Sequence, residues 1–127
     1  MKNYSLLFLR LLVAAILFQT LYFKFTAHPD SVHIFSRLGL EPVGRIGIGI
    51  MELIAGLLLL FSRGVWLGAL IALGLMVGAI FFHLTQLGIE VNNDGGILFI
   101  LAVLVFVGSL LILRLVWKNI PFINKKV

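Results

Sequence analysis

The chain has 127 residues, 61% of them hydrophobic, and a mean hydropathy of +1.17, which is far above the range of soluble globular domains. Its net charge of +5 comes from basic residues scattered between apolar runs, and this scatter argues against a nucleic-acid-binding patch. Because the chain contains no cysteine, it forms neither disulfides nor thiolate-metal sites, and the composition indicates a single domain, residues 1–127, with lipid as its solvent.

Four segments reach the roughly 20 apolar residues that a membrane-spanning helix requires. They lie at about 5–25, 43–61, 65–84 and 96–116. Only Ser62, Arg63 and Gly64 separate the second segment from the third, and so short a connection forces two helices into an antiparallel hairpin. We therefore predict an all-α membrane protein, a four-transmembrane-helix antiparallel bundle.

The first segment also has the outline of a signal peptide, because Lys2 precedes an apolar run. However, Arg10 interrupts that run, and no small residues at cleavage spacing follow before Lys24. We expect an uncleaved first helix whose Arg10 snorkels to the inner interface.

Lysine and arginine are distributed unequally between the two sides of the predicted bundle, and in membrane proteins the cytoplasmic loops are the richer ones. The side of the termini holds Lys2, Arg10, Arg63, Arg114, Lys118, Lys125 and Lys126. The other side holds Lys24, Arg37 and Arg45. We expect a multi-pass protein of the cell's inner membrane with both termini in the cytoplasm. The bias also argues against a dual-topology transporter of the small multidrug-resistance type, which needs nearly balanced charges.

The connection between the first two spans is long enough for a short interfacial helix. Asp30 has the chemistry of an N-cap residue and Gly39 that of a helix stop. Ile34, Phe35 and Leu38 share a face that we expect to lie against the membrane.

Three histidines raise the question of a metal or haem site. His28 and His33 lie five residues apart across a helix start, a spacing that matches no strong ligand motif, so we predict no metal site. His83 is the only histidine inside a predicted span, which argues against a bis-histidine haem.

Glu52 lies at the middle of the second span, where a charged side chain is costly and is by default a functional candidate. Its short side chain does not reach water, so it must be paired, protonated or beside a wet cavity. Helical side chains lean towards the N-terminus of their helix, so Lys24 and His83 lean from the outer side towards Glu52. We predict that these three residues converge in the outer half of the bundle, with Arg45 at its mouth.

This polar cluster allows two interpretations. A static buried ion pair can fix the register of the helices without any further role. Alternatively, Lys24, Glu52, His83 and Arg45 bind a ligand, because ionisable groups inside the membrane often mark functional sites. The residues alone leave both interpretations open.

Small residues recur at four-residue spacing in the third span, at Gly64, Gly68 and Ala72 and again at Gly74 and Gly78. This spacing lets helix backbones approach closely in lipid. We expect it to serve packing within the bundle, with a homodimer face as the alternative.

Turn-forming residues crowd the sequence just before the last span. We expect Asp94 or Asn93 to cap the fourth membrane helix, with a cation-binding loop as the alternative. Together with Glu90, Asp94 would make the outer mouth of the bundle acidic.

Several short motifs together resemble the DoxX family of small bacterial membrane proteins. They are Phe23-Lys24-Phe25-Thr26, Gly44-Arg45 followed by Glu52-Leu53, His83-Leu84-Thr85 with Leu87-Gly88-Ile89, and Asp94-Gly95-Gly96-Ile97-Leu98-Phe99. Their order along nearly the whole chain carries the resemblance, which implies a four-helix membrane bundle. Some relatives are linked to thiosulfate:quinone oxidoreductase and to oxidative-stress complexes, and a related animal branch acts in receptor assembly.

The resemblance favours a redox- or quinone-associated membrane subunit, in which Lys24, Glu52 and His83 bind a quinone or another small polar head group. Whether such a subunit is itself an enzyme stays open. The alternative is a non-enzymatic membrane chaperone or assembly factor, which binds a partner protein or a second copy of the chain in the membrane. A proton-coupled carrier that uses Glu52 is the weakest hypothesis, since the chain has no discontinuous helix repeats.

Overall fold

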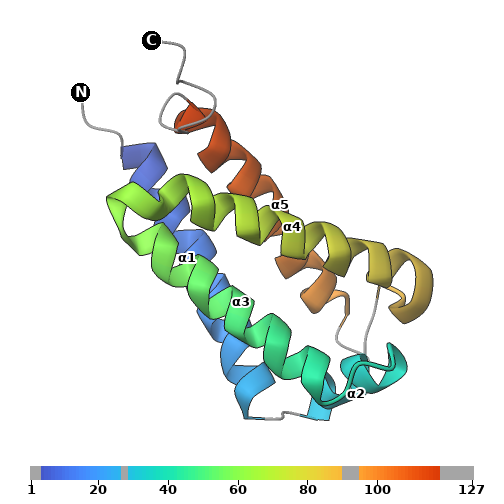
Figure 1. Ribbon diagram of the computed structural model, residues 1–127. Coiled ribbons are helices and arrows are strands. Elements are labelled where there is room, and N and C mark those ends of the chain that lie inside the picture. Colours follow the sequence, from blue (N-terminus) through green and yellow to red (C-terminus); the bar gives the residue numbers. More distant parts are fainter. Residues whose placement is uncertain (1–3, 27–28, 90–94, 118–127) are drawn as a thin grey trace.

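The computed structural model describes residues 4–26, 29–89 and 95–117, and these are almost entirely helical (Figure 1). The four long helices are α1 (Tyr4–Phe25), α3 (Val43–Leu60), α4 (Val65–Phe82) and α5 (Ile97–Leu115). Each belongs to a segment that is long and apolar enough to cross a membrane. The predicted all-α fold with four membrane helices is therefore confirmed, and the helix ends differ from the predicted ones by only a few residues.

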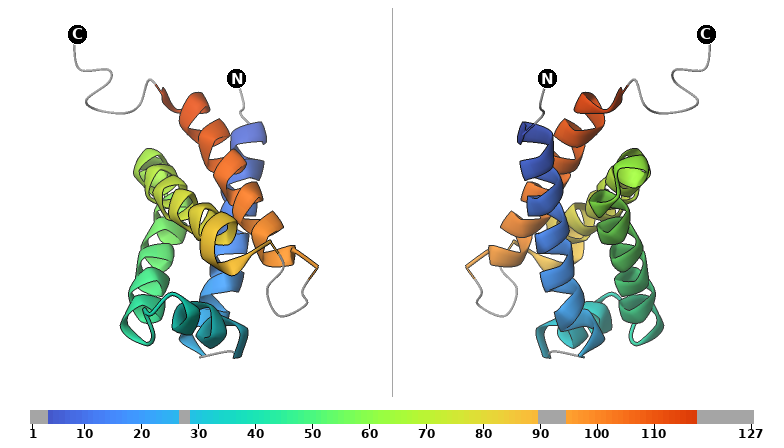
Figure 2. Two further views of the ribbon diagram at one scale, coloured as in Figure 1. Left: turned by 90° about the vertical axis from the view of Figure 1, so that its right-hand side faces the viewer. Right: turned by 90° about the vertical axis from the view of Figure 1, so that its left-hand side faces the viewer.

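The long helices form an antiparallel bundle in which each one packs mainly against two others. Helix α1 packs against α3 and α5, and α4 packs against the same two. The turn η1 (Ser62–Gly64) joins α3 to α4 as a hairpin. The start of α1 and the finish of α5 lie at the same end of the bundle (Figure 1, Figure 2). We call this the terminal end.

A short helix, α2 (Pro29–Arg37), crosses the opposite end of the bundle, which we call the α2 end (Figure 1). It lies between the first two spans, as predicted. The prediction of Asp30 as the N-cap was wrong, because the helix already begins at Pro29, and proline is well suited to a first helical residue. Gly39 has φ +74°, which stops the helix as predicted.

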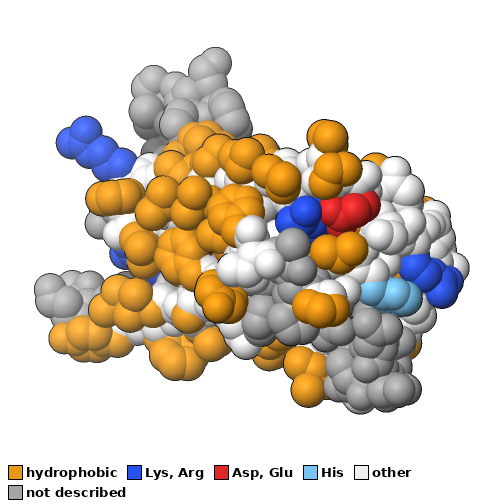
Figure 3. Space-filling model, turned by 90° about the horizontal axis from the view of Figure 1, so that it is seen from below, with side chains coloured by type: hydrophobic (Ala, Val, Ile, Leu, Met, Phe, Trp, Pro, Cys, Tyr) orange, Lys and Arg blue, Asp and Glu red, His pale blue; other side chains and the backbone are white. Residues whose placement is uncertain are grey.

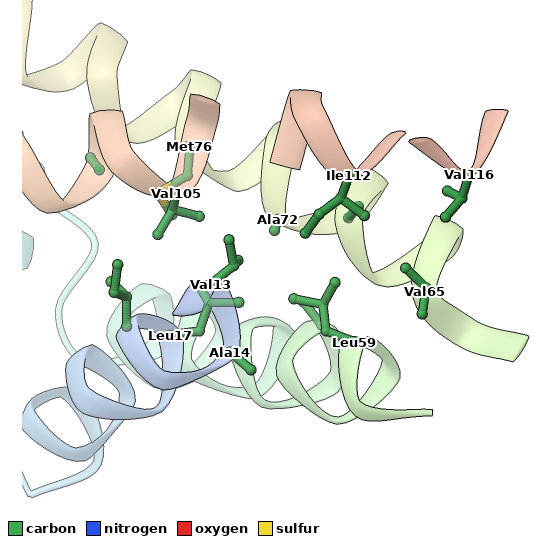
Figure 4. Packing of buried hydrophobic residues seen from close by; sticks show 14 residues of the cluster. Val13, Ala14, Leu17, Leu59, Val65, Ala72, Met76, Val105, Ile112 and Val116 are labelled. Atoms are coloured by element: carbon green, nitrogen blue, oxygen red, sulfur yellow. The ribbon is translucent and has the colours of Figure 1, made fainter. Parts of the chain in front are cut away.

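The closely packed apolar core lies towards the terminal end (Figure 4). Helix α3 contributes residues from its last turns, including Leu59, and α4 contributes residues from its first turns, including Val65. They meet Val13 of α1 and Ile112 of α5, which are fully buried. Close van der Waals packing of this kind holds helices together in lipid, where the hydrophobic effect does not.

The glycines of α4 serve two different purposes. A Cβ atom at Gly68 would lie 2.8 Å from the carbonyl oxygen of Ala55 and 3.0 Å from the backbone nitrogen of Leu59, so α3 and α4 touch backbone to backbone there. At Gly74 and Gly78, a Cβ atom would meet no heavy atom within 4 Å. The expectation of close packing therefore holds at Gly68 and is wrong at Gly74 and Gly78.

The third predicted span changes its helix type near its C-terminal end. The α-helical geometry of α4 gives way to a π-helical turn, η2 (His83–Leu87). Gly88 follows with φ +83°, a conformation that favours glycine, and it ends the segment. Turns of this kind are uncommon and occur frequently at functional sites.

Helix α5 begins after two glycines with positive φ, Gly95 at +69° and Gly96 at +86°. Gly96 occupies the N-cap position of the helix. The predicted caps, Asp94 and Asn93, lie outside the described residues, as does Glu90.

Candidate functional site

A cavity of about 480 Å³ opens between the helices, and its lining residues come from α1 to α5 and from η2. Its walls are mostly apolar, with leucine, isoleucine and phenylalanine side chains predominating. Lys24, Glu52 and His83 supply the charged and imidazole groups of the lining. A concave, largely apolar site of this size with a few convergent polar groups is typical of small-molecule binding sites.

Lys24 and Glu52 form an ion pair in the wall of this cavity. The Nζ atom of Lys24 lies 3.1 Å from Oε1 and 3.3 Å from Oε2 of Glu52. Glu52 is only 2% exposed, so its carboxylate depends on Lys24 and on close neighbours such as Thr20 in place of water. The adjacent helices α1 and α3 run antiparallel, which lets the two side chains lean towards each other from opposite ends.

His83 reaches the same cavity, but its ring is held by its own turn. Nδ1 lies 2.9 Å from the carbonyl oxygen of Gly88, and the ring packs edge-on against Phe99 with 5.5 Å between the ring centroids. The ring is 6% exposed. The structure thus brings Lys24 and Glu52 into contact, as predicted. His83 lines the same cavity, but its ring bonds to the carbonyl of Gly88 and not to Glu52.

Arg45 does not line the cavity. Its Nε donates to the Glu41 carboxylate at 2.8 Å, and its NH1 group donates to the carbonyl oxygen of Lys24. The residue is 8% exposed. Arg45 therefore anchors the end of α1, and with it the backbone of Lys24, and its predicted position at the mouth of the bundle stays a prediction.

A comparison with protein families identifies the family of the chain. A family model described as DoxX matches residues 5–85, which is more than half of the chain. The chain belongs to the DoxX family. The matched region includes Lys24, Glu52 and His83, whereas the motif from Asp94 to Phe99 lies beyond it. No curated protein and no solved structure matches this DoxX chain.

In this DoxX protein, three arginines each donate to a backbone carbonyl near the C-terminal end of a different helix. Arg45 serves α1, as described above. Arg10 donates to Leu59 of α3 at 2.8 Å, and Arg37 of α2 donates to Gln86 of η2 at 2.7 Å. The C-terminal end of a helix has carbonyl groups without partners and a partial negative charge, and a guanidinium satisfies both.

Two further arginine predictions have an outcome. Arg10 was predicted to snorkel to the interface, but it is bound within the bundle. Arg63 in η1 is exposed, as a topology signal would be.

Helix α2 covers the cavity of this DoxX protein. Ile34, Phe35 and Leu38 line the cavity, and Phe35 is buried. We predicted this face to lie on the membrane, and the structure corrects that prediction. Figure 3 shows the molecule from below, with hydrophobic side chains over part of its surface and a basic side chain next to an acidic one.

Sequence reasoning missed several residues of the cavity wall. Gln19 and Thr20 add an amide and a hydroxyl from α1, and Gly74 and Gly78 leave space on the α4 side. A cue for Thr20 was its position one turn before Lys24 on the same helix face. No sequence cue distinguishes a glycine that packs from one that leaves space.

Within residues 4–26, 29–89 and 95–117, no group of three His, Cys, Asp or Glu side chains is placed to hold a metal ion. His28 lies outside these residues.

Proposed function

We propose that this DoxX protein is a redox-associated membrane subunit that binds a quinone in the cavity beneath α2. The observation that carries the proposal is the buried Lys24–Glu52 pair in the wall of an otherwise mostly apolar cavity. The ammonium group of Lys24, held by Glu52, offers a donor to a quinone carbonyl, while the surrounding aliphatic side chains suit the methyl groups and the apolar tail of a quinone.

The lining also has the space that such a ring requires. The volume of about 480 Å³ lies within the range of small-molecule pockets. Gly74 and Gly78 leave space on the α4 side of the wall, because a Cβ atom at either position would touch nothing within 4 Å. The ammonium group of Lys24 has three donor hydrogens, so it can serve Glu52 and a quinone carbonyl together.

The chain contributes binding and orientation in this proposal. A bound quinone would supply the electron-carrying chemistry. The sequence contains no cysteine, so the partner in electron transfer would have to be another bound group or another protein.

Narrowing the cavity should displace the ligand. We expect Gly78→Leu to lower the amount of quinone that co-purifies in mild detergent by roughly 5- to 150-fold, because a leucine side chain that competes with the ligand for space costs about 1–3 kcal/mol of binding free energy. Mass spectrometry and absorption spectra of organic extracts measure the content. Gly47→Leu in α3 is the matched control, since Gly47 is exposed, lies outside the cavity lining and also has no heavy atom within 4 Å of its Cβ position.

Two results would contradict the proposal. One is wild-type protein that binds neither endogenous nor added quinone. The other is an equal quinone content in the Gly78→Leu and Gly47→Leu variants. A ligand-free protein that instead holds a membrane partner or a second copy in stable complex would favour an assembly factor.

We further propose that both termini face the cytoplasm, because seven lysines and arginines lie on their side against three on the other. A fluorescent protein fused after Val127 should be bright, and alkaline phosphatase fused there should be inactive. Phosphatase fused after Gly88, on the opposite side, is the control and should be active. The reverse pattern of activities would overturn this orientation.

A further inference from the structure

The protonation pattern of the His83 ring follows from its partner. A backbone carbonyl oxygen only accepts hydrogen bonds, so Nδ1 of His83, which lies 2.9 Å from the carbonyl of Gly88, must carry the hydrogen. The neutral form of the ring then has its lone pair on Nε2. Nε2 is therefore a hydrogen-bond acceptor, and from the cavity lining it can bond only to a ligand group that donates a hydrogen.

The turn around His83 holds this arrangement in place. The π-helical turn η2 and the positive φ of Gly88 bring the carbonyl back towards the ring. Phe99 of α5 packs edge-on against the imidazole, and the Gln86 carbonyl of the same turn is bound by Arg37 of α2. Among the described residues, the ion pairs are Lys24 with Glu52 and Arg45 with Glu41, so no described carboxylate pairs with His83.

The two oxidation states of a quinone differ in what they offer to such a ring. The oxidised form carries carbonyl oxygens, which only accept hydrogen bonds. The reduced form carries hydroxyl groups, which donate as well as accept. Lys24 can serve either form, whereas Nε2 of His83 can bond only to the hydroxyl of the reduced one.

Resting on the proposed function, we propose that the cavity prefers the reduced, hydroxyl-bearing form of its ring ligand, because that form donates to Nε2 of His83. His83 is then the residue that determines specificity between the two oxidation states. Lys24 donates to the ring in both states and makes no such distinction, while the Glu52 carboxylate is bound by Lys24.

The test compares three probes of nearly the same size: a short-chain alkyl benzoquinone, its hydroquinone kept reduced under anaerobic conditions, and the dimethyl ether of that hydroquinone. Equilibrium binding is measured on the detergent-solubilised full-length protein at about pH 8, above the range in which most histidines titrate, with empty micelles as the blank. We expect the hydroquinone to bind roughly 5- to 10-fold more tightly than the quinone, the size of one neutral hydrogen bond. The ether, which cannot donate, should bind no more tightly than the quinone.

The variant His83→Phe keeps a ring against Phe99 and lacks Nε2, so the preference should fall to about 1-fold while quinone affinity stays unchanged. Thr85→Val in the same turn is the matched control, because Thr85 is exposed and lies outside the cavity lining. Equal binding of quinone and hydroquinone by the wild type, or a preference that survives in His83→Phe, would overturn this inference and leave the proposed function standing. Failure of the wild type to bind either form would overturn both.

Discussion

Lys24→Met is expected to lower the free energy of unfolding by about 3–5 kcal/mol, the usual result of removing one partner from a buried ion pair. Glu52 is 2% exposed, and without Lys24 its carboxylate would lose the cation that pairs with it inside the bundle. Titration from mild detergent into denaturing detergent, followed by circular dichroism, measures the loss.

Two comparisons make this prediction specific. The double variant Lys24→Met with Glu52→Gln removes the unpaired charge, so it should recover at least half of the loss. Arg63→Met removes an exposed cation at the terminal end and should change stability by less than about 0.5 kcal/mol. Lys24→Met and Arg63→Met variants of equal stability would show that the Lys24–Glu52 contact does not hold the bundle together.

Gly68→Leu is expected to cost at least about 1–3 kcal/mol, because overfilling a packed contact forces the backbone to move. A Cβ atom there would already lie 2.8 Å from one backbone oxygen and 3.0 Å from one backbone nitrogen of α3, and neither can rotate away as a flexible side chain would. The hairpin formed by α3 and α4 would have to open at this point.

The matched control is Gly74→Leu in the same helix, where a Cβ atom meets no heavy atom within 4 Å. It should change stability by less than about 0.5 kcal/mol in the same unfolding titration. A similar loss in both variants would mean that leucine is tolerated poorly in α4 for some reason other than contact with α3.

The membrane helices and the approach of Lys24 to Glu52 could be predicted from the sequence because both follow from local rules. Hydropathy and length locate the spans, and the lean of helical side chains towards the N-terminus brings Lys24 of α1 and Glu52 of α3 together. The hydrogen bond of His83 could not be predicted in the same way. It depends on a π-helical turn, and the residues of η2 carry no pattern that distinguishes it from an α-helix.

The role of α2 and of the α4 glycines could not be predicted for a different reason. Lipid and a ligand cavity are both apolar, so the amphipathic pattern of Ile34, Phe35 and Leu38 fits either surface equally well. Likewise, small residues at four-residue spacing can allow two helices to touch, as at Gly68, or can leave space in the wall of a cavity, as at Gly78. Only the positions of the neighbouring helices decide between these outcomes.

The three arginine bonds to helix ends join parts of the chain that are far apart in sequence. The bonds from Arg10 and Arg37 each span 49 positions, and the bond from Arg45 spans 21. In a chain without cysteines, these bonds link distant parts of the chain, as disulfides do in other proteins. A guanidinium keeps its charge at every physiological pH and is not oxidised as a thiol is, so these three bonds persist when the redox state around the protein changes.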